Sequence, residues 1–334
     1  MSLPPVVIPL GAMRFNSDSQ KLEYFNGETW FQVHTFSTAP LDGGHRGLFA
    51  GGGTPSYLNA IDYITISTAG NSQDFGDLTH AVMCGGSGSS NVRGLFAGGG
   101  NPDRKNEIDY VTISQLGNAV DFGDLTVNRS QAAGNSTQTR FVLATGSSPG
   151  GIVNTIDYVT IASTGNAVDF GDVSQVLEWP AGATSPTRGL IGGGVNPSAI
   201  NNIEFITMAT TGNSQDFGDM SQTGSWLGGG LSSPVRAVFG GSYDTVIEYV
   251  TFTTLGNTTD FGDLTDDRGD LATSSDSVRG VFAGGRSAPG PAGVNTMDYI
   301  QIMSQGNAID FGDFHASVKI TLFGSVSSGH GGLG

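Results

Sequence analysis

The sequence predicts an all-β protein made of six similar units, each with four short antiparallel strands. Three observations support this prediction. The string Asp-Phe-Gly-Asp occurs six times at intervals of 44 to 50 residues, each copy follows an acidic residue paired with an aromatic one, and no long apolar segment has helical periodicity. The six copies begin at Asp74, Asp121, Asp169, Asp216, Asp260 and Asp310.

Each unit contains short runs that are typical of strands. In the second unit, 108–113 is β-branched and aromatic and lies between turn residues. The run 93–97 is apolar and closed by glycines, 121–125 is a third short strand, and the small polar stretch 126–139 has room for a fourth. An arginine opens each unit, and we expect these six arginines to pair with the repeated carboxylates. They are Arg46, Arg93, Arg140, Arg188, Arg236 and Arg279.

Six four-stranded units favour a β-propeller, because radial closure leaves few sheet edges exposed. The first unit starts at Arg46 without a strand before it, whereas a remnant at 320–324 follows the last unit. We expect this C-terminal strand to complete the first blade and close the ring. The alternative is a β-solenoid or fibre-like array, which would need capping units instead. The Gly-Gly pair after the arginine run, followed by an aromatic residue, resembles the kelch motif, with Phe in place of the usual tryptophan.

Length variation between the units concentrates in one connection. The spacing from the acidic residue to Asp-Phe-Gly-Asp is constant, whereas the spacing from the arginine to the acidic residue varies from 12 to 19 residues. The loop between strands two and three is therefore the variable one, and loops carry function on rigid scaffolds. Its residues either contact a ligand or vary neutrally. The candidates for binding are Tyr57, Arg104, Lys105, Tyr243 and Arg286.

A second variable position lies seven residues after each Asp-Phe-Gly-Asp. It holds Cys84, Gln131, Trp179, Trp226, Asp270 and Ile320. Trp179 and Trp226 occupy equivalent places in adjacent units, where they could stack on sugar rings or anchor a protein partner. The simpler interpretation is that both fill space at the narrow end of two blades.

Charge and composition exclude several classes of protein. The formal charge is 14 − 30 = −16, which opposes binding to nucleic acid. No apolar run is long enough to insert into a membrane, and the first residues do not predict a secretory signal. With Cys84 as the single cysteine, neither an internal disulfide nor a thiolate zinc site is expected.

No cofactor and no catalytic residue are predicted. Asp-Phe-Gly matches the magnesium-binding triplet of kinases, but the other kinase motifs are absent; we expect its aspartates to bond backbone amides in a turn. Calcium binding by Asn71, Asp74 and Asp77 is an alternative, although their spacing is not that of an EF-hand. The five histidines do not recur in the units. An enzyme is therefore the least favoured function.

Residues 1–45 precede the repeats and predict a small β-hairpin module. Two strand-like runs flank an Asn-Gly turn at Asn26, a strong hairpin signal. So short a segment buries little surface, so we expect it to attach to a neighbour. The predicted attachment residues are Arg14, Phe15, Leu22, Tyr24 and Trp30, with the last four sharing one apolar face.

This module resembles one found in virion proteins of tailed bacteriophages, including tail fibres. The pattern is carried by Gly11, Arg14, Phe15, Asn16, Leu22, Glu23, Tyr24, Asn26, Gly27 and Trp30. The repeat array is similar to repeats in phages of marine bacteria, notably cyanophages.

The resemblance implies a non-enzymatic virion protein, assembled in the host cytoplasm. Residues 1–45 would bind other virion proteins, and the propeller over 46–334 would recognise a host surface glycan or receptor. The alternatives are a carbohydrate-binding propeller without a virion role and a propeller-type enzyme.

Overall fold

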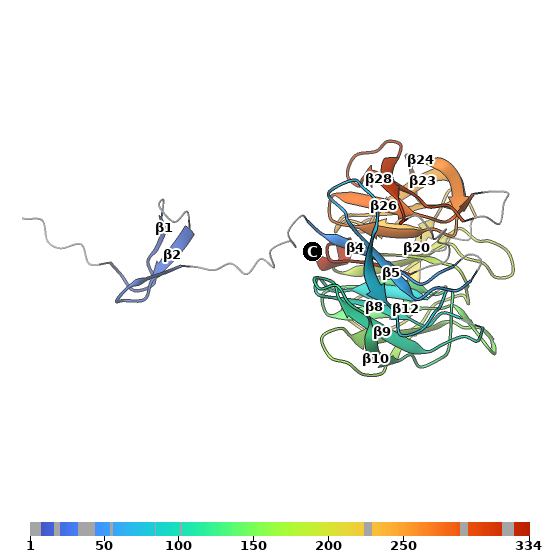
Figure 1. Cartoon of the computed structure of the whole chain (residues 1–334), viewed down its shortest axis with the longest axis horizontal. Coiled ribbons are helices and arrows are strands. Elements are labelled where there is room, and N and C mark those ends of the chain that lie inside the picture. The colour runs from blue at the N-terminus through green and yellow to red at the C-terminus, as the bar shows by residue number, and fades with distance from the viewer. Residues whose placement is uncertain are drawn as a thin grey trace, which may run out of the picture. The chain divides into compact units, whose positions relative to one another are not determined.

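The computed structural model describes residues 8–16, 21–32, 44–53, 56–83, 85–100, 102–223, 229–287, 293–315 and 324–334. The chain divides into two compact units, Met1–Asp42 and Gly43–Gly334; the sequence had suggested a boundary after residue 45. Within the described residues both units are all-β: antiparallel strands make up the structure, and a single 3₁₀ turn, η1 (Gly331–Leu333), is the only helical element (Figure 1).

The first unit is a three-stranded sheet of β1 (Met13–Asn16), β2 (Lys21–Phe25) and β3 (Trp30–Gln32). The register pairs Tyr24 with Phe31 and Phe25 with Trp30. Since neighbouring residues on a strand point to opposite faces, Trp30 lies on the opposite face from Tyr24. The prediction that Trp30 shares an apolar face with Tyr24 is therefore wrong, and Phe31, stacked on Tyr24 at a centroid distance of 5.7 Å, takes that place.

The second unit contains six repeat sheets, each with four antiparallel strands per repeat unit as the sequence predicts. In spatial order the strands of the first three repeat sheets are β30 (Gly324–Ser327), β4 (Arg46–Ala50), β5 (Ala60–Thr65) and β6 (Gln73–Asp77); β7 (Gly86–Ser89), β8 (Arg93–Ala97), β9 (Glu107–Thr112) and β10 (Val120–Asp124); β11 (Ala133–Ser136), β12 (Arg140–Ala144), β15 (Thr155–Thr160) and β16 (Val168–Asp172).

The other three repeat sheets follow the same plan. They are β17 (Ala181–Thr184), β18 (Arg188–Gly192), β19 (Asn202–Thr207) and β20 (Gln215–Asp219); β21 (Gly230–Ser232), β22 (Arg236–Gly240), β23 (Ser242–Thr251) and β24 (Thr259–Gly269), with β27 (Arg286–Ser287) added at the edge; β25 (Ala272–Ser275), β26 (Arg279–Ala283), β28 (Thr296–Gln301) and β29 (Ile309–Asp313). A short ribbon of β13 (Ser147–Ser148) and β14 (Gly151–Ile152) stands apart.

The first repeat sheet joins the two ends of the second unit. Strand β30 comes from the end of the chain, yet it pairs with β4, with Val326 opposite Leu48 (Figure 1). The sequence predicts this strand at 320–324; the described strand begins at Gly324, and 320–323 lie outside the described residues.

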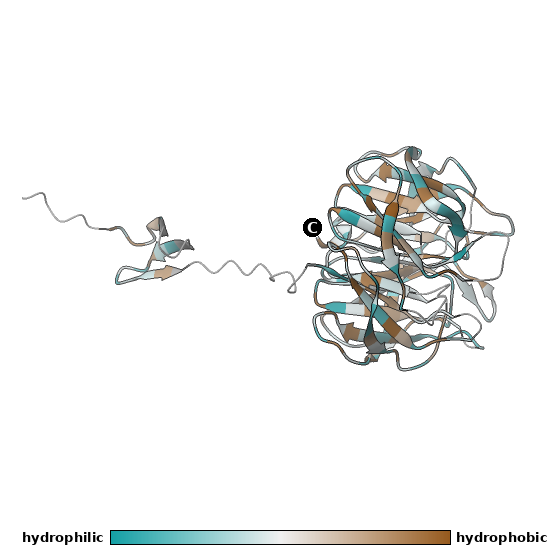
Figure 2. Cartoon of the chain, turned by 45° about the horizontal axis from the view of Figure 1, so that its top comes forward, coloured by the Kyte–Doolittle hydropathy of each residue, from teal (hydrophilic) through white to brown (hydrophobic). Residues whose placement is uncertain are grey.

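Contacts between neighbouring repeat sheets follow a cyclic order. The first strands β7, β11, β17, β21, β25 and β30 each contact the next, and β30 also contacts β7. Hydrophobic residues are distributed along the strands (Figure 2). Their side chains pack between neighbouring sheets, as those of Leu95 and Phe141 do. One core cluster joins Phe49 and Ile64 of the first repeat sheet to Val281 and Phe311 of the sixth.

The repeated aromatic pair and arginine form one stack within each unit. The Phe of Asp-Phe-Gly-Asp meets the preceding aromatic ring edge to face, as Phe75 does with Tyr63 at 6.2 Å. The unit arginine lies over the same ring, with Arg46 Cζ 4.8 Å from the Tyr63 centroid, a favourable cation–π contact. Arg46 Nη1 then donates to the carbonyl of Ile113 in the next repeat sheet at 3.1 Å.

The expectation that the unit arginines pair with carboxylates is therefore wrong. All six stack on an aromatic ring and donate to a carbonyl of the next repeat sheet. The repeated carboxylates instead accept from hydroxyls at the junction of adjacent sheets. Thr126 Oγ1, for example, donates to Asp157 Oδ1 at 2.6 Å.

Asp-Phe-Gly-Asp forms the fourth strand of each repeat sheet rather than a turn. The backbone NH of the last aspartate in each motif donates to the side-chain oxygen of an asparagine in the next unit, as Asp77 N does to Asn118 Oδ1 at 3.1 Å. In the last unit the partner is Asn71 of the first unit, which accepts from Asp313 N at 3.1 Å. Asn71, an alternative calcium ligand, thus uses its amide oxygen in a junction between units.

Candidate binding face

One side of the six repeat sheets carries both variable positions, and we call it the loop face. It comprises the connections between second and third strands and the segments that enter the first strands. These segments pair with each other: Met83 bridges to Gly100, Ser130 to Ser147 and Glu178 to Val195. The two kinds of variable residue therefore lie side by side.

Backbone strain concentrates on the loop face. Five described residues other than glycine have φ between 55° and 66°, and all five belong to this face: Gln131, Thr145, Trp179, Tyr243 and Asp270. Left-handed backbone costs a non-glycine residue of order 1–3 kcal/mol and persists where the surroundings enforce it, often at functional sites. Gln131, Trp179 and Asp270 occupy the same repeat position, so one strained conformation presents three different side chains.

Two predicted residues meet at a buried carboxylate. Tyr243 donates its hydroxyl to Asp270 Oδ2, and Arg286 forms an ion pair with the same oxygen. Asp270 is only 3% exposed, whereas Tyr243 and Arg286 remain about one-third exposed. The carboxylate thus holds an aromatic ring and a guanidinium at the surface. Among the described residues this arrangement occurs only between the fifth unit, which has the shortest second-to-third loop, and the sixth unit, which has the longest.

The remaining candidates are separate from this cluster. Arg104 Nη2 donates to Ser147 Oγ at 2.7 Å, and Lys105 forms a long ion pair with Glu107 at 3.7 Å. Tyr57 is 40% exposed. Trp179 is half-buried, and its backbone NH donates to the Gln131 carbonyl at 3.0 Å. Trp226 lies outside the described residues.

A cavity of about 120 Å³ runs between the six first strands. Six hydroxyl residues, one from each first strand, line it at equivalent positions: Ser89, Ser136, Thr184, Ser232, Ser275 and Ser327. Four of them donate to the carbonyl of a neighbour: Ser232 to Thr184, Ser275 to Ser232, Ser327 to Ser275 and Ser89 to Ser327, at 2.5–2.9 Å. The hydroxyls thus join neighbouring first strands around the cavity.

His330 occupies the place where this pattern is interrupted. Its Nε2 lies 3.1 Å from the Ser89 carbonyl and 3.2 Å from Ser136 Oγ, and its Nδ1 accepts from Gly332 N at 3.1 Å. These partners require the neutral tautomer with the proton on Nε2. Burial lowers the pKa of His330 to about 4. The segment after β30 therefore lines the end of the cavity opposite the loop face.

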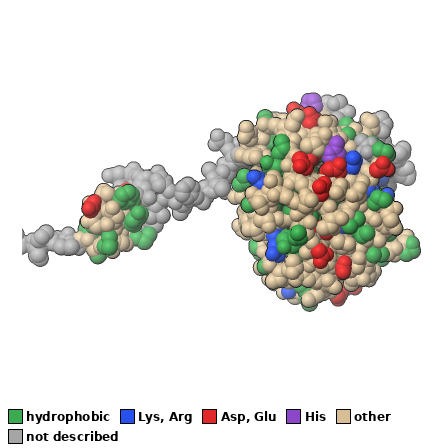
Figure 3. Space-filling model, turned by 90° about the horizontal axis from the view of Figure 1, so that it is seen from below, with side chains coloured by type: hydrophobic (Ala, Val, Ile, Leu, Met, Phe, Trp, Pro, Cys, Tyr) green, Lys and Arg blue, Asp and Glu red, His purple; other side chains and the backbone are tan. Residues whose placement is uncertain are grey.

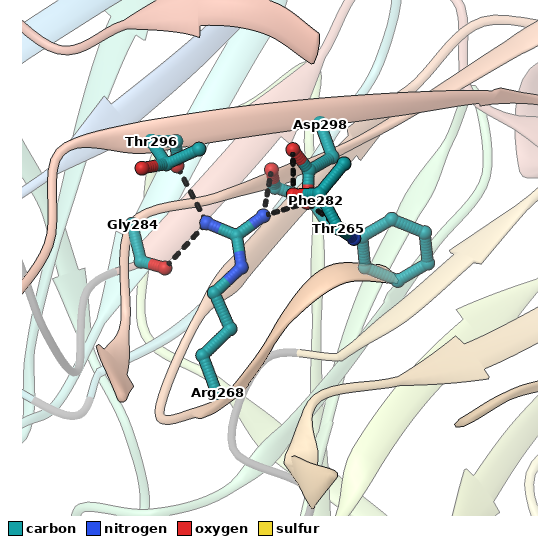
Figure 4. A network of polar contacts seen from close by, with 6 residues as sticks. All are labelled: Thr265, Arg268, Phe282, Gly284, Thr296 and Asp298. Atoms are coloured by element: carbon teal, nitrogen blue, oxygen red, sulfur yellow. Dashed lines mark hydrogen bonds and ion pairs between the residues drawn. The ribbon is translucent and has the colours of Figure 1, made fainter. Parts of the chain in front are cut away.

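Two buried arginines form a structural charge network next to the loop face. Arg268 donates to Thr296 O, Gly284 O and Asp298 Oδ2 at 2.6, 3.0 and 2.5 Å, and Thr265 shares the same carboxylate (Figure 4). Arg129 repeats the arrangement with Asp157 at 2.9 Å. Both arginines lie five residues after Asp-Phe-Gly-Asp. This repeated spacing is the sequence signal by which they could have been identified. His330 is unrepeated, so no such signal marks it.

In the view of Figure 3, acidic and basic side chains are dispersed among neutral ones. Among the described residues, no group of three or more His, Cys, Asp or Glu side chains could hold a metal ion. No helix in that part of the chain is long and apolar enough to cross a membrane.

No family model matches the sequence, and no curated protein matches it.

Proposed function

We propose that the chain is a non-enzymatic virion protein whose second unit is a closed six-bladed β-propeller that recognises a host surface through its loop face. The observation that carries the recognition role is the gathering of strained and variable side chains on one face of a uniform scaffold. The virion role rests on the resemblance of the first unit to phage modules.

Closure is supported by two contacts between the sixth and first units that also occur at each of the other junctions between units. Arg279 Nη1 donates to Ile66 O at 3.0 Å, as Arg46 does to Ile113 O. Gly70 N donates to Phe311 O at 2.7 Å, as Gly117 does to Phe75 O at 2.9 Å. Strand β30, from the end of the chain, pairs with β4 of the first unit and so adds a further connection between the end and the beginning of the repeats. A solenoid would leave these groups of its first and last units unpaired.

The attachment role predicts that a chain lacking residues 1–42 folds but does not enter particles. The first unit presents Met13, Tyr24 and Phe31 at 60%, 41% and 45% exposure, an apolar surface suited to a protein partner. Particles produced with the truncated and full chains would be compared by immunoblot. Equal incorporation would refute the attachment role, whereas absence of both chains from particles would leave a propeller that binds carbohydrate without a virion role.

The recognition role predicts loss of adsorption when Tyr57, Arg104, Tyr243 and Arg286 are replaced together by alanine. The matched control replaces Val92, Leu116 and Leu255, which are exposed at hairpins on the opposite side of the sheets. Both variants would be checked for unchanged unfolding temperature before adsorption to host cells is measured. Normal adsorption of the folded loop variant would contradict the role of this face.

A further inference from the structure

A small cavity between the first two repeat sheets lies where two other junctions contain a buried arginine. Arg129 and Arg268 lie five residues after Asp-Phe-Gly-Asp in their units, and Val82 occupies that position in the first unit. Valine is short and uncharged, so it cannot reach the acceptors that a guanidinium binds. Val82 lines a cavity of about 20 Å³, which is large enough for an occupant of the size of a water molecule.

The lining of this cavity repeats the groups that bind a guanidinium at the other junctions. Arg268 donates to three backbone carbonyls and to the Asp298 carboxylate (Figure 4). Arg129 likewise donates to two backbone carbonyls and to Asp157. The second-unit residues at the positions of these acceptors all line the cavity, namely Phe96, Gly98, Glu107 and Asp109.

Asp109 is buried without the cation that its equivalents have. The residue is 4% exposed, and its carboxylate accepts from Thr79 N and Thr79 Oγ1 at 2.9 and 2.8 Å. Asp157 and Asp298 also accept from a threonine, but each pairs with an arginine as well. Among the described residues, no basic side chain forms an ion pair with Asp109. Because a buried charge is costly unless it is paired, this junction would gain from a cation.

Glu107 brings a second carboxylate to the cavity and connects it with solvent. It lies two residues before Asp109 on β9, so the two side chains share one face of the strand. Glu107 Oε2 is buried without a hydrogen-bond partner among the described residues. Oε1 lies 3.7 Å from Lys105 Nζ, and the side chain as a whole is 39% exposed. The carboxylate of Glu107 therefore extends from the surface to the cavity, and an ion can exchange along it.

We propose that this cavity binds one monovalent cation of about the size of a water molecule, K⁺, Na⁺ or NH₄⁺. The Asp109 carboxylate and Glu107 Oε2 are its charged ligands, and the carbonyls at the positions that accept from arginine elsewhere supply neutral oxygens. The cation stabilises the junction of the first two repeat sheets, as arginine does at two others.

A divalent ion fits this site less well. Calcium takes six to eight oxygen ligands, several of them carboxylates. Among the described residues, no group of three or more His, Cys, Asp or Glu side chains could hold a metal ion. The inference is independent of the proposed recognition function, since the cavity lies within a junction between sheets.

The test measures the unfolding temperature of the full chain at about pH 8, where imidazole groups are neutral. The probes are the chlorides of potassium, sodium and ammonium at about 200 mM, and choline chloride is the reference with a cation too large for the cavity. A site with a Kd of about 10 mM raises the unfolding temperature by roughly 3–5 °C in at least one of the three salts relative to choline. Calcium chloride at the same ionic strength tests the divalent alternative. Equal unfolding temperatures in all salts, or a response to calcium alone, would overturn the proposal.

Two variants assign the response to this cavity. Val82→Arg supplies the guanidinium that the other junctions contain, and Asp109→Asn removes the charged ligand while retaining an acceptor for Thr79. Asp169→Asn removes an exposed carboxylate in the third unit and serves as the control. We expect the difference between the responsive salt and choline to disappear in both site variants and to persist in the control. A folded site variant with the full wild-type response, or a control that loses it, would refute the assignment.

Discussion

Arg129 and Arg268 place guanidinium groups where water does not reach them. Burial lowers the pKa of both, and Asp157 and Asp298 act against that shift. Each guanidinium also donates to backbone carbonyls. Because arginine stays protonated in proteins, removal of one partner leaves an isolated buried charge.

We predict that Arg268→Met lowers the free energy of unfolding by about 3–5 kcal/mol, because the Asp298 carboxylate then stays buried without its cation. The Arg268→Met, Asp298→Asn double variant should lose less than the sum of the two single variants. Chemical denaturation of the four proteins measures this coupling. Additive losses would show that the two charges do not stabilise each other.

His330 makes stability depend on pH. Its pKa is about 4 in the folded chain against 6.5 ordinarily, so the unfolded chain binds the proton more strongly. Its contribution is intact above about pH 6.5, declines as the pH falls towards 4 and levels off below that. The full loss is about 3 kcal/mol, at 1.36 kcal/mol per pKa unit.

We predict that His330→Gln flattens the stability profile between pH 6.5 and 4, since glutamine can donate to the Ser89 carbonyl without titrating. Burial raises the pKa of Asp62, Asp244 and Glu248, which changes stability in the opposite direction, so the difference between variant and wild type is the quantity to measure. Parallel profiles would mean that His330 does not titrate as described.

Close approach of the first strands depends on glycine. A Cβ at Gly182 would clash with the carbonyl of Gly134, and one at Gly134 would clash with that of Ser87. Three of the six junctions between first strands have such glycine contacts, including Gly230 against Gly182; at the others Thr273, Ser325 and Ser87 donate hydroxyls to the neighbouring carbonyl. The glycine contacts and the hydroxyl hydrogen bonds both allow neighbouring first strands to pack with their backbones nearly in contact.

We therefore predict that Gly182→Ala lowers the free energy of unfolding by about 2–3 kcal/mol through overpacking. Gly100→Ala is the matched control, because Gly100 has no left-handed φ and the nearest atom to its Cβ position is 3.9 Å away. It should change stability by less than about 0.5 kcal/mol. Equal effects in urea denaturation would contradict the account of strand packing.

At the scale of the whole molecule, the proposed ring is held by backbone junctions that lie far apart in sequence. β30 pairs with β4, and Asp313 reaches Asn71. The first and last strands of the second unit must therefore come together before the first repeat sheet is complete. This makes closure a long-range step in folding.

We predict that deletion of 324–334 lowers the unfolding temperature by roughly 10 °C or more, because several kcal/mol of strand pairing is lost and the edge of β4 becomes exposed. Deletion of 330–334 retains β30 and should have a smaller effect. Calorimetry compares the two truncated chains with the full one. If loss of 324–334 leaves unfolding unchanged, the ring is not closed by β30.

The sequence by itself determined what repetition makes visible. Asp-Phe-Gly-Asp, the aromatic pairs and the arginines marked six units, because each unit buries the same side chains with the same two-residue period. The variable positions were visible for the same reason: they depart from the pattern at places such as Trp179 and Asp270.

Only the tertiary structure decided which groups meet. The arginines bind aromatic rings and carbonyls instead of carboxylates, Trp30 turns away from Tyr24, and His330 enters a row of hydroxyls contributed by the first strands of the repeat sheets. Each result depends on a neighbour brought close by sheet register or by contact between units. Spacing along the chain records local periodicity, whereas these partners are distant in sequence, and so the site could be located in outline but not in its chemistry.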